Sequence, residues 1–333
     1  MKNIYFIINN HGNHQNIINS GSGASEFIFY LTAYKLSSLY NITIFNRDNP
    51  NKIDNIEYKF LPNNMNPDIE NINDSIIIVQ RHFNILIDLH KINSSNKYIL
   101  WSHDYLENNF EHLSGNYSPK EINNYFSKLI DIVAVSNFHK NNILSKLPNV
   151  NVHVIYNALF PELYVKKEAN VNYNNIVFAS NWAKGLDKVL NIGTMYYNIN
   201  PNFKLLLLKP SYCDWMPDLT KYKFIKIIGN IKNKKEYCEL LQSCLCVLTT
   251  SYPETFGCVF AEALHLGVPV IGDNSIDSGF LEIIQKDHIC NFNNVNDVIS
   301  KIEEFRMNRP TVCLDNKFYS EFIITDLINL INI

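Results

Sequence analysis

Short apolar runs alternate with longer amphipathic stretches along most of the chain. Buried strands of a parallel sheet read as near-continuous apolar runs, whereas amphipathic helices repeat apolar residues every three to four positions. The pattern therefore predicts repeated strand–helix units. In the first half we expect strands at 2–8, 42–45, 57–60, 75–79, 98–101, 132–135 and 152–156. We expect helices at 26–40 and 119–129, and a third helix that follows the strand 132–135 and ends at about residue 147.

A polar, turn-rich stretch at 161–175 predicts a linker, after which the alternation starts again. The second series has expected strands at 176–179, 204–208, 224–228 and 244–248, and expected helices at 186–197, 234–242, 279–285, 295–305 and 318–330. Two such series predict two doubly wound, Rossmann-like α/β domains, at residues 1–160 and 161–316, that face each other across a ligand-binding cleft.

The clearest strand–helix–strand unit begins with the apolar run 244–248 and ends in a short strand after Pro269. Between them lie a turn with a proline, then Gly257, then an apolar-periodic helix. Two carboxylates flank the start of this helix: Glu254 lies in the turn before it and Glu262 lies about two turns in. Taken alone, these residues could merely complement the helix dipole and occupy an exposed helix position.

Other polar groups follow the ends of the expected strands, which is where open α/β sheets bind ligands. They include His103, Asp104 and Asn137. The loop 9–25 also follows a strand, but its segment Gly21-Ser22-Gly23 lacks the third glycine of a dinucleotide-binding turn and the loop is too long for one, so we do not expect a NAD site. Backbone N–H groups beside a helix N-terminus can still bind an anion.

Composition narrows the class of protein. The 333 residues are 46% hydrophobic and 18% charged, with a net charge of −3, so the chain can bury more than one core and lacks the basic excess of a nucleic-acid-binding protein. The seven cysteines include no C-x-x-C pair and are expected to be reduced. Neither a signal peptide nor a membrane-spanning run is expected, and we expect a cytoplasmic protein. The N-terminal helices carry few lysines, which disfavours membrane association but leaves peripheral binding open.

The residues around the two glutamates resemble a known family. Pro253-Glu254-Thr255-Phe256-Gly257, followed by Glu262-Ala263-Leu264 and Gly267-Val268-Pro269-Val270-Ile271, is similar to the E-x7-E signature of family-4-type retaining glycosyltransferases of the GT-B fold, also called glycosyl transferases group 1. Lys184-Gly185-Leu186-Asp187 matches the family's Lys-Gly-x-Asp. The glycine loop at residues 21–26 and His103-Asp104 match N-terminal motifs of the family.

The resemblance implies roles for these positions. Glu262 would bind the ribose diol, Glu254 the hydroxyls of the donor sugar, and Lys184 the leaving diphosphate. His103, Glu254 and Lys184 are the expected catalytic residues, and Asp104 and Asn137 are expected on the acceptor side. The expected donor-binding residues are Gly21, Ser22, Gly23, Ser180, Asn181, Lys184, Gly185, Ile231, Glu254, Thr255, Phe256, Gly257 and Glu262. The last helix, within 317–333, is expected to pack on the first domain.

The chain departs from the family pattern at the phosphate clamp. The family has an arginine a few residues before the lysine, whereas this chain has Ala179-Ser180-Asn181-Trp182. The chain also contains no Asp-x-Asp pair, which metal-using glycosyltransferases of the other main fold require. We therefore expect no metal and no other cofactor.

The expected activity is the transfer of a hexose from a UDP- or GDP-linked sugar to a hydroxyl of a carbohydrate or glycan acceptor, with retention of configuration. Two alternatives stay open at this point. The fold also serves nucleotide-sugar epimerases and phosphorylases, and a chain without the clamp arginine could be a binding module that holds a nucleotide sugar without turning it over.

Overall fold

The computed structural model describes residues 2–20, 23–62, 67–105, 114–167, 169–209, 217–229, 231, 233–250 and 254–333. The chain folds as two compact units. The first contains the residues up to Ala158 together with Ser320–Ile333, and the second contains Leu159–Tyr319. Within the described ranges, no helix combines the length and the apolar composition needed to span a bilayer.

A mainly parallel sheet forms the centre of the first unit. Its strand order among the described residues is β3-β4-β2-β1-β5-β6-β7-β8, and only the β3–β4 pair is antiparallel. The strands are β1 (Asn3–Ile7), β2 (Asn41–Asn46), β3 (Asn51–Ile53), β4 (Ile56–Phe60), β5 (Ile76–Gln80), β6 (Lys97–Trp101), β7 (Ile130–Ala134) and β8 (Asn151–Val154).

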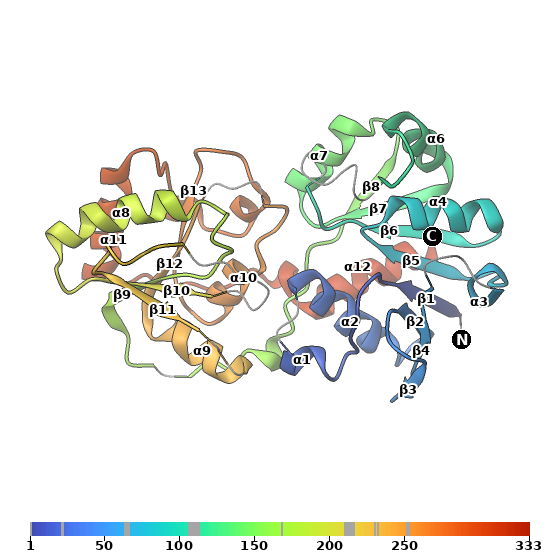
Figure 1. The fold of residues 1–333 in the computed structure, drawn as a ribbon, viewed down its shortest axis with the longest axis horizontal. Coiled ribbons are helices and arrows are strands. Elements are labelled where there is room, and N and C mark those ends of the chain that lie inside the picture. Colours follow the sequence, from blue (N-terminus) through green and yellow to red (C-terminus); the bar gives the residue numbers. More distant parts are fainter. Residues whose placement is uncertain are drawn as a thin grey trace. The chain divides into compact units, whose positions relative to one another are not determined.

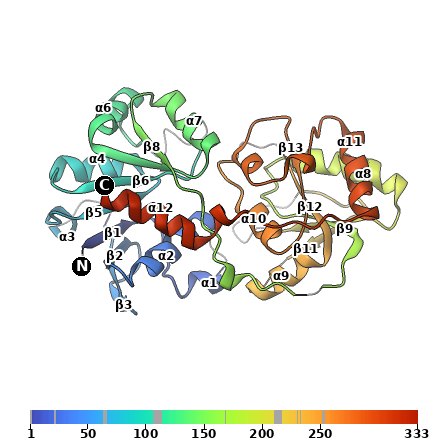
Figure 2. The ribbon, with the colours of Figure 1, turned by 180° about the vertical axis from the view of Figure 1, so that it is seen from behind.

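Helices cover both faces of this sheet (Figures 1 and 2). Successive strand residues point to opposite faces, so Val79 packs in one buried cluster with Phe83 and Phe126, whereas Phe6 meets the ring of Phe29 at a centroid distance of 5.0 Å. The helices are α1 (Ile17–Ser20), α2 (Ala24–Leu36), α3 (Pro67–Glu70), α4 (Phe83–Ile92), α6 (Pro119–Leu129), α7 (Asn137–Lys146) and α12 (Ser320–Asn332). Helix α12 packs on α2, and Lys97 Nζ donates to the Leu330 carbonyl oxygen at 2.5 Å.

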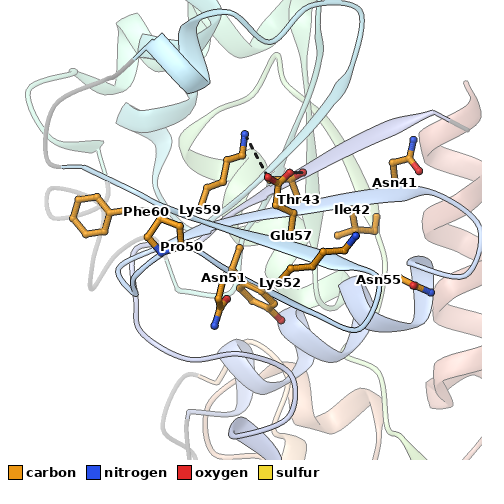
Figure 3. A pocket seen from close by; sticks show the side chains of 11 residues that line it. Asn41, Ile42, Thr43, Pro50, Asn51, Lys52, Asn55, Glu57, Lys59 and Phe60 are labelled. Atoms are coloured by element: carbon orange, nitrogen blue, oxygen red, sulfur yellow. Dashed lines mark hydrogen bonds and ion pairs between the residues drawn. The ribbon is translucent and has the colours of Figure 1, made fainter.

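A pocket of about 720 Å³ opens on the β2–β3–β4 edge of the first unit (Figure 3). Glu57 lies among its polar groups: Thr43 Oγ1 donates to it at 3.5 Å and Lys59 Nζ is 3.9 Å away. The lining residues are Asn41, Ile42, Thr43, Pro50, Asn51, Lys52, Asn55, Glu57, Tyr58, Lys59 and Phe60. This set contains none of the site residues that the sequence predicts.

The second unit contains a parallel sheet with the order β11-β10-β9-β12-β13-β14 in the part of the chain that is described. The strands are β9 (Asn172–Phe178), β10 (Lys204–Leu208), β11 (Ile225–Ile228), β12 (Cys244–Thr249), β13 (Val270–Asp273) and β14 (Ile289–Cys290). The helices are α8 (Leu186–Ile199), α9 (Lys234–Gln242), α10 (Cys258–His265) and α11 (Val295–Met307), with short 3₁₀ turns at Pro161–Leu163, Gly279–Glu282, Lys286–His288 and Asn316–Phe318.

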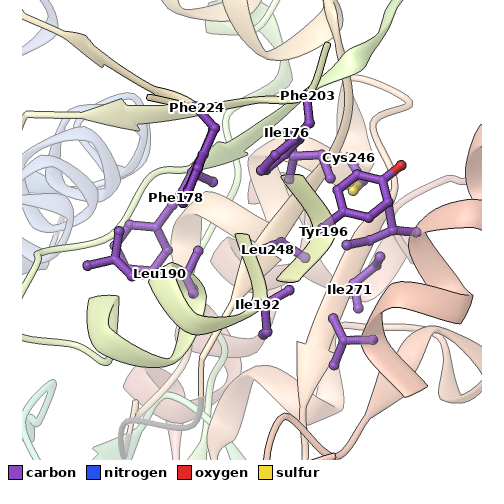
Figure 4. Packing of buried hydrophobic residues seen from close by; sticks show 14 of the residues in the cluster. Ile176, Phe178, Leu190, Ile192, Tyr196, Phe203, Phe224, Cys246, Leu248 and Ile271 are labelled. Atoms are coloured by element: carbon purple, nitrogen blue, oxygen red, sulfur yellow. The ribbon is translucent and has the colours of Figure 1, made fainter. Parts of the chain in front are cut away.

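Aromatic and aliphatic side chains form the buried core of the second unit (Figure 4). Tyr196 of α8 meets Phe203 edge-on at 5.0 Å, and Phe203 stacks on Phe224 at 5.6 Å. Ile302 and Phe305 of α11 belong to the same buried cluster, so α8 and α11 pack together on one face of the sheet. Helix α9 contacts β12, and α10 contacts β13.

The prediction of two parallel-sheet α/β domains is confirmed, and two local predictions are wrong. The expected linker at 161–175 ends in strand β9, which starts at Asn172. Its first residues are polar, but pairing with β12 and β10 draws them into the sheet. The expected helix at 279–285 is a 3₁₀ turn at Gly279–Glu282. The Gly279 N–H donates to the carbonyl oxygen of Glu254 at 2.7 Å, and this hydrogen bond connects the turn to the loop that contains Glu254.

Candidate active site

Lys184 and Glu254 form an ion pair in the second unit. Lys184 lies in the loop between β9 and α8, Glu254 lies in the loop between β12 and α10, and Lys184 Nζ is 2.6 Å from Glu254 Oε2. Both loops follow strand ends, and β9 and β12 are neighbours in the sheet. The two side chains are 33% and 24% exposed, so the pair is accessible to a ligand.

The backbone of Glu254 is fixed by the loop after β13. Its N–H donates to Ser278 Oγ at 3.0 Å. Its carbonyl oxygen accepts from Ser278 Oγ at 3.1 Å and from Gly279 N–H at 2.7 Å. Because these bonds use only main-chain atoms of Glu254, its carboxylate stays available for Lys184 or for a ligand.

Glycine is required where the lysine loop meets β12. Gly185 has a φ of +79°, and a Cβ there would lie 2.6 Å from Thr250 Oγ1. Thr250 Oγ1 in turn donates to the Lys184 carbonyl oxygen. This close approach, together with the left-handed conformation, excludes larger residues and fixes the start of α8.

The N-terminus of α10 begins directly after the predicted turn. Gly257 has a φ of +96° and forms its N-cap, and buried Phe256 packs against Phe318 at a centroid distance of 5.8 Å. Thr255 is half-buried before them. The N-terminus of a helix carries the positive end of the helix dipole and favours anions, so this end of α10 suits a phosphate group.

Glu262 lies in α10 and is almost buried. Its Oε1 accepts from the Tyr164 hydroxyl, and its Oε2 accepts from the Tyr237 hydroxyl at 2.6 Å. Lys234 Nζ is 3.4 Å from Oε1. The sequence predicts a role for neither tyrosine nor this lysine, because Tyr164 falls in the stretch expected to be a linker and the others lie on a helix that carries no motif.

The remaining donor-side positions have more ordinary surroundings. Asn181 Oδ1 accepts from the Ala183 N–H at 2.9 Å, so its side chain shapes the lysine loop. Ser180 and Ile231 are half-buried at strand ends. Gly21 and Ser22 lie outside the described residues.

In the first unit, Arg81 joins several of the predicted positions. Its Nη1 donates to Glu26 Oε1 at 2.7 Å, its Nη2 donates to Ser25 Oγ at 2.6 Å, and its Nε is 2.9 Å from Asp104 Oδ2. Gly23 lies against the same group, since a Cβ there would collide with the Glu26 carboxylate. Arg81 itself has a φ of +66°, an uncommon conformation for a residue with a side chain that points to a constrained site. No sequence motif singles out Arg81.

Two buried histidines lie beside this group. Burial, followed by the charges of Arg81 and His139, holds the pKa of His103 well below its ordinary value. Burial also lowers the pKa of His139 to about 4, although its bond to the Asp104 carbonyl oxygen opposes the change. His103 is therefore neutral at pH 7 and stacks on Trp101 at 5.7 Å. Asn137 Nδ2 donates to the Tyr156 hydroxyl at 3.0 Å at the start of α7.

The described residues contain no cluster of three or more histidine, cysteine or acidic side chains that could hold a metal ion. What the second unit offers instead is a helix N-terminus, a lysine–glutamate pair and a nearly buried carboxylate. These groups suit an anionic, hydroxyl-rich ligand.

The structure resembles several solved structures over nearly its whole length. Sucrose-phosphate synthase from Thermosynechococcus elongatus matches with a TM-score of 0.74 at 13% identity, covering 99% of this chain and 98% of that one. Trehalose-6-phosphate synthase from E. coli, bound with UDP-2-fluoro glucose, matches with a TM-score of 0.68 at 11% identity, covering 99% and 95%. HepE from Anabaena, in complex with UDP and glucose, matches with a TM-score of 0.65 at 15% identity over 100% of both chains. At these identities the matches establish the fold.

The sequence itself has no significant match among curated proteins. A family model does match: residues 212–317 fit the model described as Glycosyl transferases group 1, a region that includes Ile231, Glu254 and Glu262. The region 212–317 is therefore similar to the group 1 glycosyltransferases, and the chain has the GT-B fold of its structural neighbours.

Proposed function

We propose that the protein transfers a hexose from a UDP- or GDP-linked sugar to a hydroxyl of a carbohydrate or glycan acceptor, with retention of configuration and without a metal ion. The observation that carries this proposal is the Lys184–Glu254 pair beside the N-terminus of α10. A sugar nucleotide presents a diphosphate and a polyhydroxy sugar side by side. A cation beside a helix N-terminus suits the first, and a carboxylate suits the second.

In the proposed reaction the bond between the sugar C1 and the β-phosphate oxygen breaks, and its electron pair stays on the phosphate. The acceptor oxygen bonds to C1 from the same face, and its proton passes to the leaving phosphate oxygen. Lys184 and the N–H groups of α10 would stabilise the charge that develops on the diphosphate. Glu254 would orient the sugar through its hydroxyls, and Glu262 would bind the ribose.

The first unit would supply the acceptor side. Neutral His103 can exchange a hydrogen bond with a hydroxyl, and Asp104 is held by Arg81 at the end of β6. Asn137, at the start of α7, is proposed for the same side. Two of the similar structures were solved with UDP-2-fluoro glucose or with UDP and glucose bound, which supports a UDP-sugar as the first donor to test.

Metal independence and a cytoplasmic location are part of the same proposal. The chain has no Asp-x-Asp pair, and Lys184 would provide the positive charge that a metal ion provides elsewhere. The described cysteines are free thiols, as is usual in a reducing compartment.

Incubation with UDP-glucose, UDP-N-acetylglucosamine, GDP-mannose and GDP-glucose tests the proposal, with a panel of sugar acceptors and with EDTA present. We expect release of one nucleoside diphosphate and an α-linked product by NMR. Conversion of the donor sugar without release of diphosphate would instead indicate an epimerase. Failure of all four donors and of both UDP and GDP to bind would reject the proposal.

A further inference from the structure

The carboxylate of Glu262 is held by two tyrosines from separate parts of the second unit. Tyr164 follows the 3₁₀ turn Pro161–Leu163, and Tyr237 lies in α9. Each hydroxyl takes a different oxygen: Tyr164 donates to Oε1 and Tyr237 donates to Oε2 at 2.6 Å. The carboxylate is therefore fixed in rotation as well as in position.

The direction of these bonds follows from charge and burial. Burial, and then the nearby charge of Glu262, raises the pKa of both tyrosines well above the ordinary value of 10. Both hydroxyls therefore keep their protons at neutral pH and donate to Glu262. An ionised carboxylate has no proton to donate and only accepts hydrogen bonds, so the two phenols must be the donors.

Tyr164 is itself held from several sides. Its hydroxyl accepts from Lys234 Nζ at 2.7 Å, and the same Nζ lies 4.5 Å from its ring centre and 5.3 Å from that of Tyr237. His265 Nε2 is 3.0 Å from its backbone oxygen. These contacts fix the tyrosines, so they act as a rigid support and not as mobile groups that a ligand sweeps aside.

The support leaves bonding capacity on Glu262. An ionised carboxylate can accept about four hydrogen bonds, two on each oxygen. Each tyrosine uses one site, and Lys234, at 3.4 Å, makes a long contact with Oε1. The Glu262 side chain keeps 11% of its surface exposed, so a ligand can reach it.

We propose that Tyr164 and Tyr237 are positioning residues that bind one oxygen each of Glu262 and orient its remaining lone pairs toward the two ribose hydroxyls of the donor nucleotide. This inference rests on the proposed function. It adds that recognition of the ribose depends on groups outside the E-x7-E motif, one of them in the segment that enters the second unit.

Binding of ribonucleotides and 2′-deoxyribonucleotides tests this role. The probes are UDP and GDP with their counterparts dUDP and dGDP, measured by calorimetry on the wild-type chain and on Tyr164→Phe, Tyr237→Phe and Glu262→Gln. We expect the wild type to prefer the ribonucleotide by roughly tenfold or more, since the deoxy form leaves part of a charged acceptor unsatisfied. Each tyrosine variant is expected to lose most of this preference, as Glu262→Gln does.

A matched control is present in the same unit. Tyr196 of α8 donates to Glu303 Oε1 of α11, so Tyr196→Phe removes a similar tyrosine–glutamate bond away from the motif. We expect it to lower stability to a similar degree and to leave the ribose preference unchanged. If a Tyr164 or Tyr237 variant does not fold, Lys234→Met, which removes the donor to Tyr164 and the long contact with Glu262 Oε1, is expected to reduce the preference by a smaller factor.

The outcomes separate the two proposals. An unchanged ribose preference in both tyrosine variants, with loss in Glu262→Gln, would overturn the positioning role and leave the proposed function intact. Tighter binding of UDP or GDP in the variants would also overturn it, because the tyrosines would then compete with the ribose. Absence of binding of any of the four nucleotides to the wild type would reject the proposed function and this inference with it.

Discussion

Lys184 Nζ lies 2.6 Å from Glu254 Oε2, across the ends of the neighbouring strands β9 and β12. The two residues are 70 positions apart in sequence, and the order of strands in the sheet is what brings them together. Each neutralises the other in this structure. A bound sugar nucleotide would replace this ion pair with two interactions, one between the phosphate and Lys184 and one between the sugar hydroxyls and Glu254. Each residue would then exchange the other for a group of the ligand.

Replacement of Lys184 by methionine removes the charge and keeps most of the side-chain volume. We expect kcat to fall by about 10²–10³-fold and the Kd for UDP or GDP to rise about tenfold, because the leaving diphosphate loses a cation. Stability should change by less than about 1 kcal/mol, since the ion pair is partly exposed. Lys167→Met, which breaks an exposed pair with Glu239, is the control and should leave turnover and binding unchanged. Equal effects of both variants would reject the assignment.

Glu254→Gln should separate turnover from nucleotide binding. The main-chain bonds of Glu254 to Ser278 and Gly279 remain, so the loop is expected to keep its form. We expect turnover to fall about 100-fold, because the sugar loses a charged acceptor. Affinity for UDP or GDP should rise about threefold, because Lys184 no longer pairs with a carboxylate. Weaker nucleotide binding with unchanged turnover would place Glu254 at the nucleotide and not at the sugar.

Much of this arrangement could be predicted from sequence, since apolar runs mark strands and ligands bind after strand ends in such sheets. Lys184, Glu254 and His103 all follow expected strands. Their partners could not be predicted, because partners depend on strand order. Lys184 pairs with Glu254 only because β9 lies beside β12. The hydrogen bond from Tyr164 to Glu262 comes from a segment whose polar composition resembles a linker, so the sequence gives no sign of it.

Arg81 shows the same limit in the first unit. Arg81 follows β5 in a left-handed backbone conformation that no residue pattern predicts. It forms ion pairs with Glu26 and Asp104 only because the sheet places their elements close together. Helix α4, which starts two residues later, was also not predicted, although Phe83, Leu86 and Ile87 show its apolar spacing.

Arg81→Met should destabilise the first unit. The variant leaves the nearly buried Glu26 without its cation, which we expect to cost about 2–3 kcal/mol, less than for a fully buried pair because Arg81 is 30% exposed. Arg81→Lys should recover part of the loss, since it restores the charge but not the separate bonds to Glu26 and Ser25. Urea unfolding measures both. Arg306→Met, which breaks a surface pair with Glu303, should cost less than about 1 kcal/mol, and a similar cost for Arg81→Met would contradict the prediction.

Three glycine-to-alanine variants should show graded losses of stability. Gly257 combines a φ of +96° with a Cβ position 2.5 Å from Phe260 Cδ2, so Gly257→Ala should cost about 2–4 kcal/mol. Gly267 has a φ of +75° but open space, and Gly267→Ala should cost about 1 kcal/mol. Gly229 has neither constraint, and Gly229→Ala should change stability by less than about 0.5 kcal/mol. If Gly257→Ala lowered the melting temperature no more than Gly229→Ala does, the start of α10 would tolerate a side chain.

His139 should make stability depend on pH. Its Nε2 is 2.9 Å from the Asp104 carbonyl oxygen and its Nδ1 is 3.3 Å from the Val135 nitrogen, an arrangement that fits the neutral ring with its proton on Nε2. Protonation would place a second N–H against the Val135 N–H. Burial accordingly lowers the pKa of His139 to about 4, compared with about 6.5 in an unfolded chain.

The sign of the effect follows from these two values. Between pH 6.5 and 4 the unfolded chain binds more protons than the folded chain, so stability falls as the pH falls through this window and is fully present above it. The loss from His139 between pH 8 and pH 5 should be about 2 kcal/mol, and His103, whose pKa burial also lowers, adds to it in the same direction. Urea unfolding of the wild type and of His139→Gln at both pH values isolates the contribution, because the amide does not titrate. The difference between the two pH values should shrink by about 2 kcal/mol in the variant. An equal pH dependence in the two proteins would mean that His139 accepts a proton in the folded chain as readily as in the unfolded one.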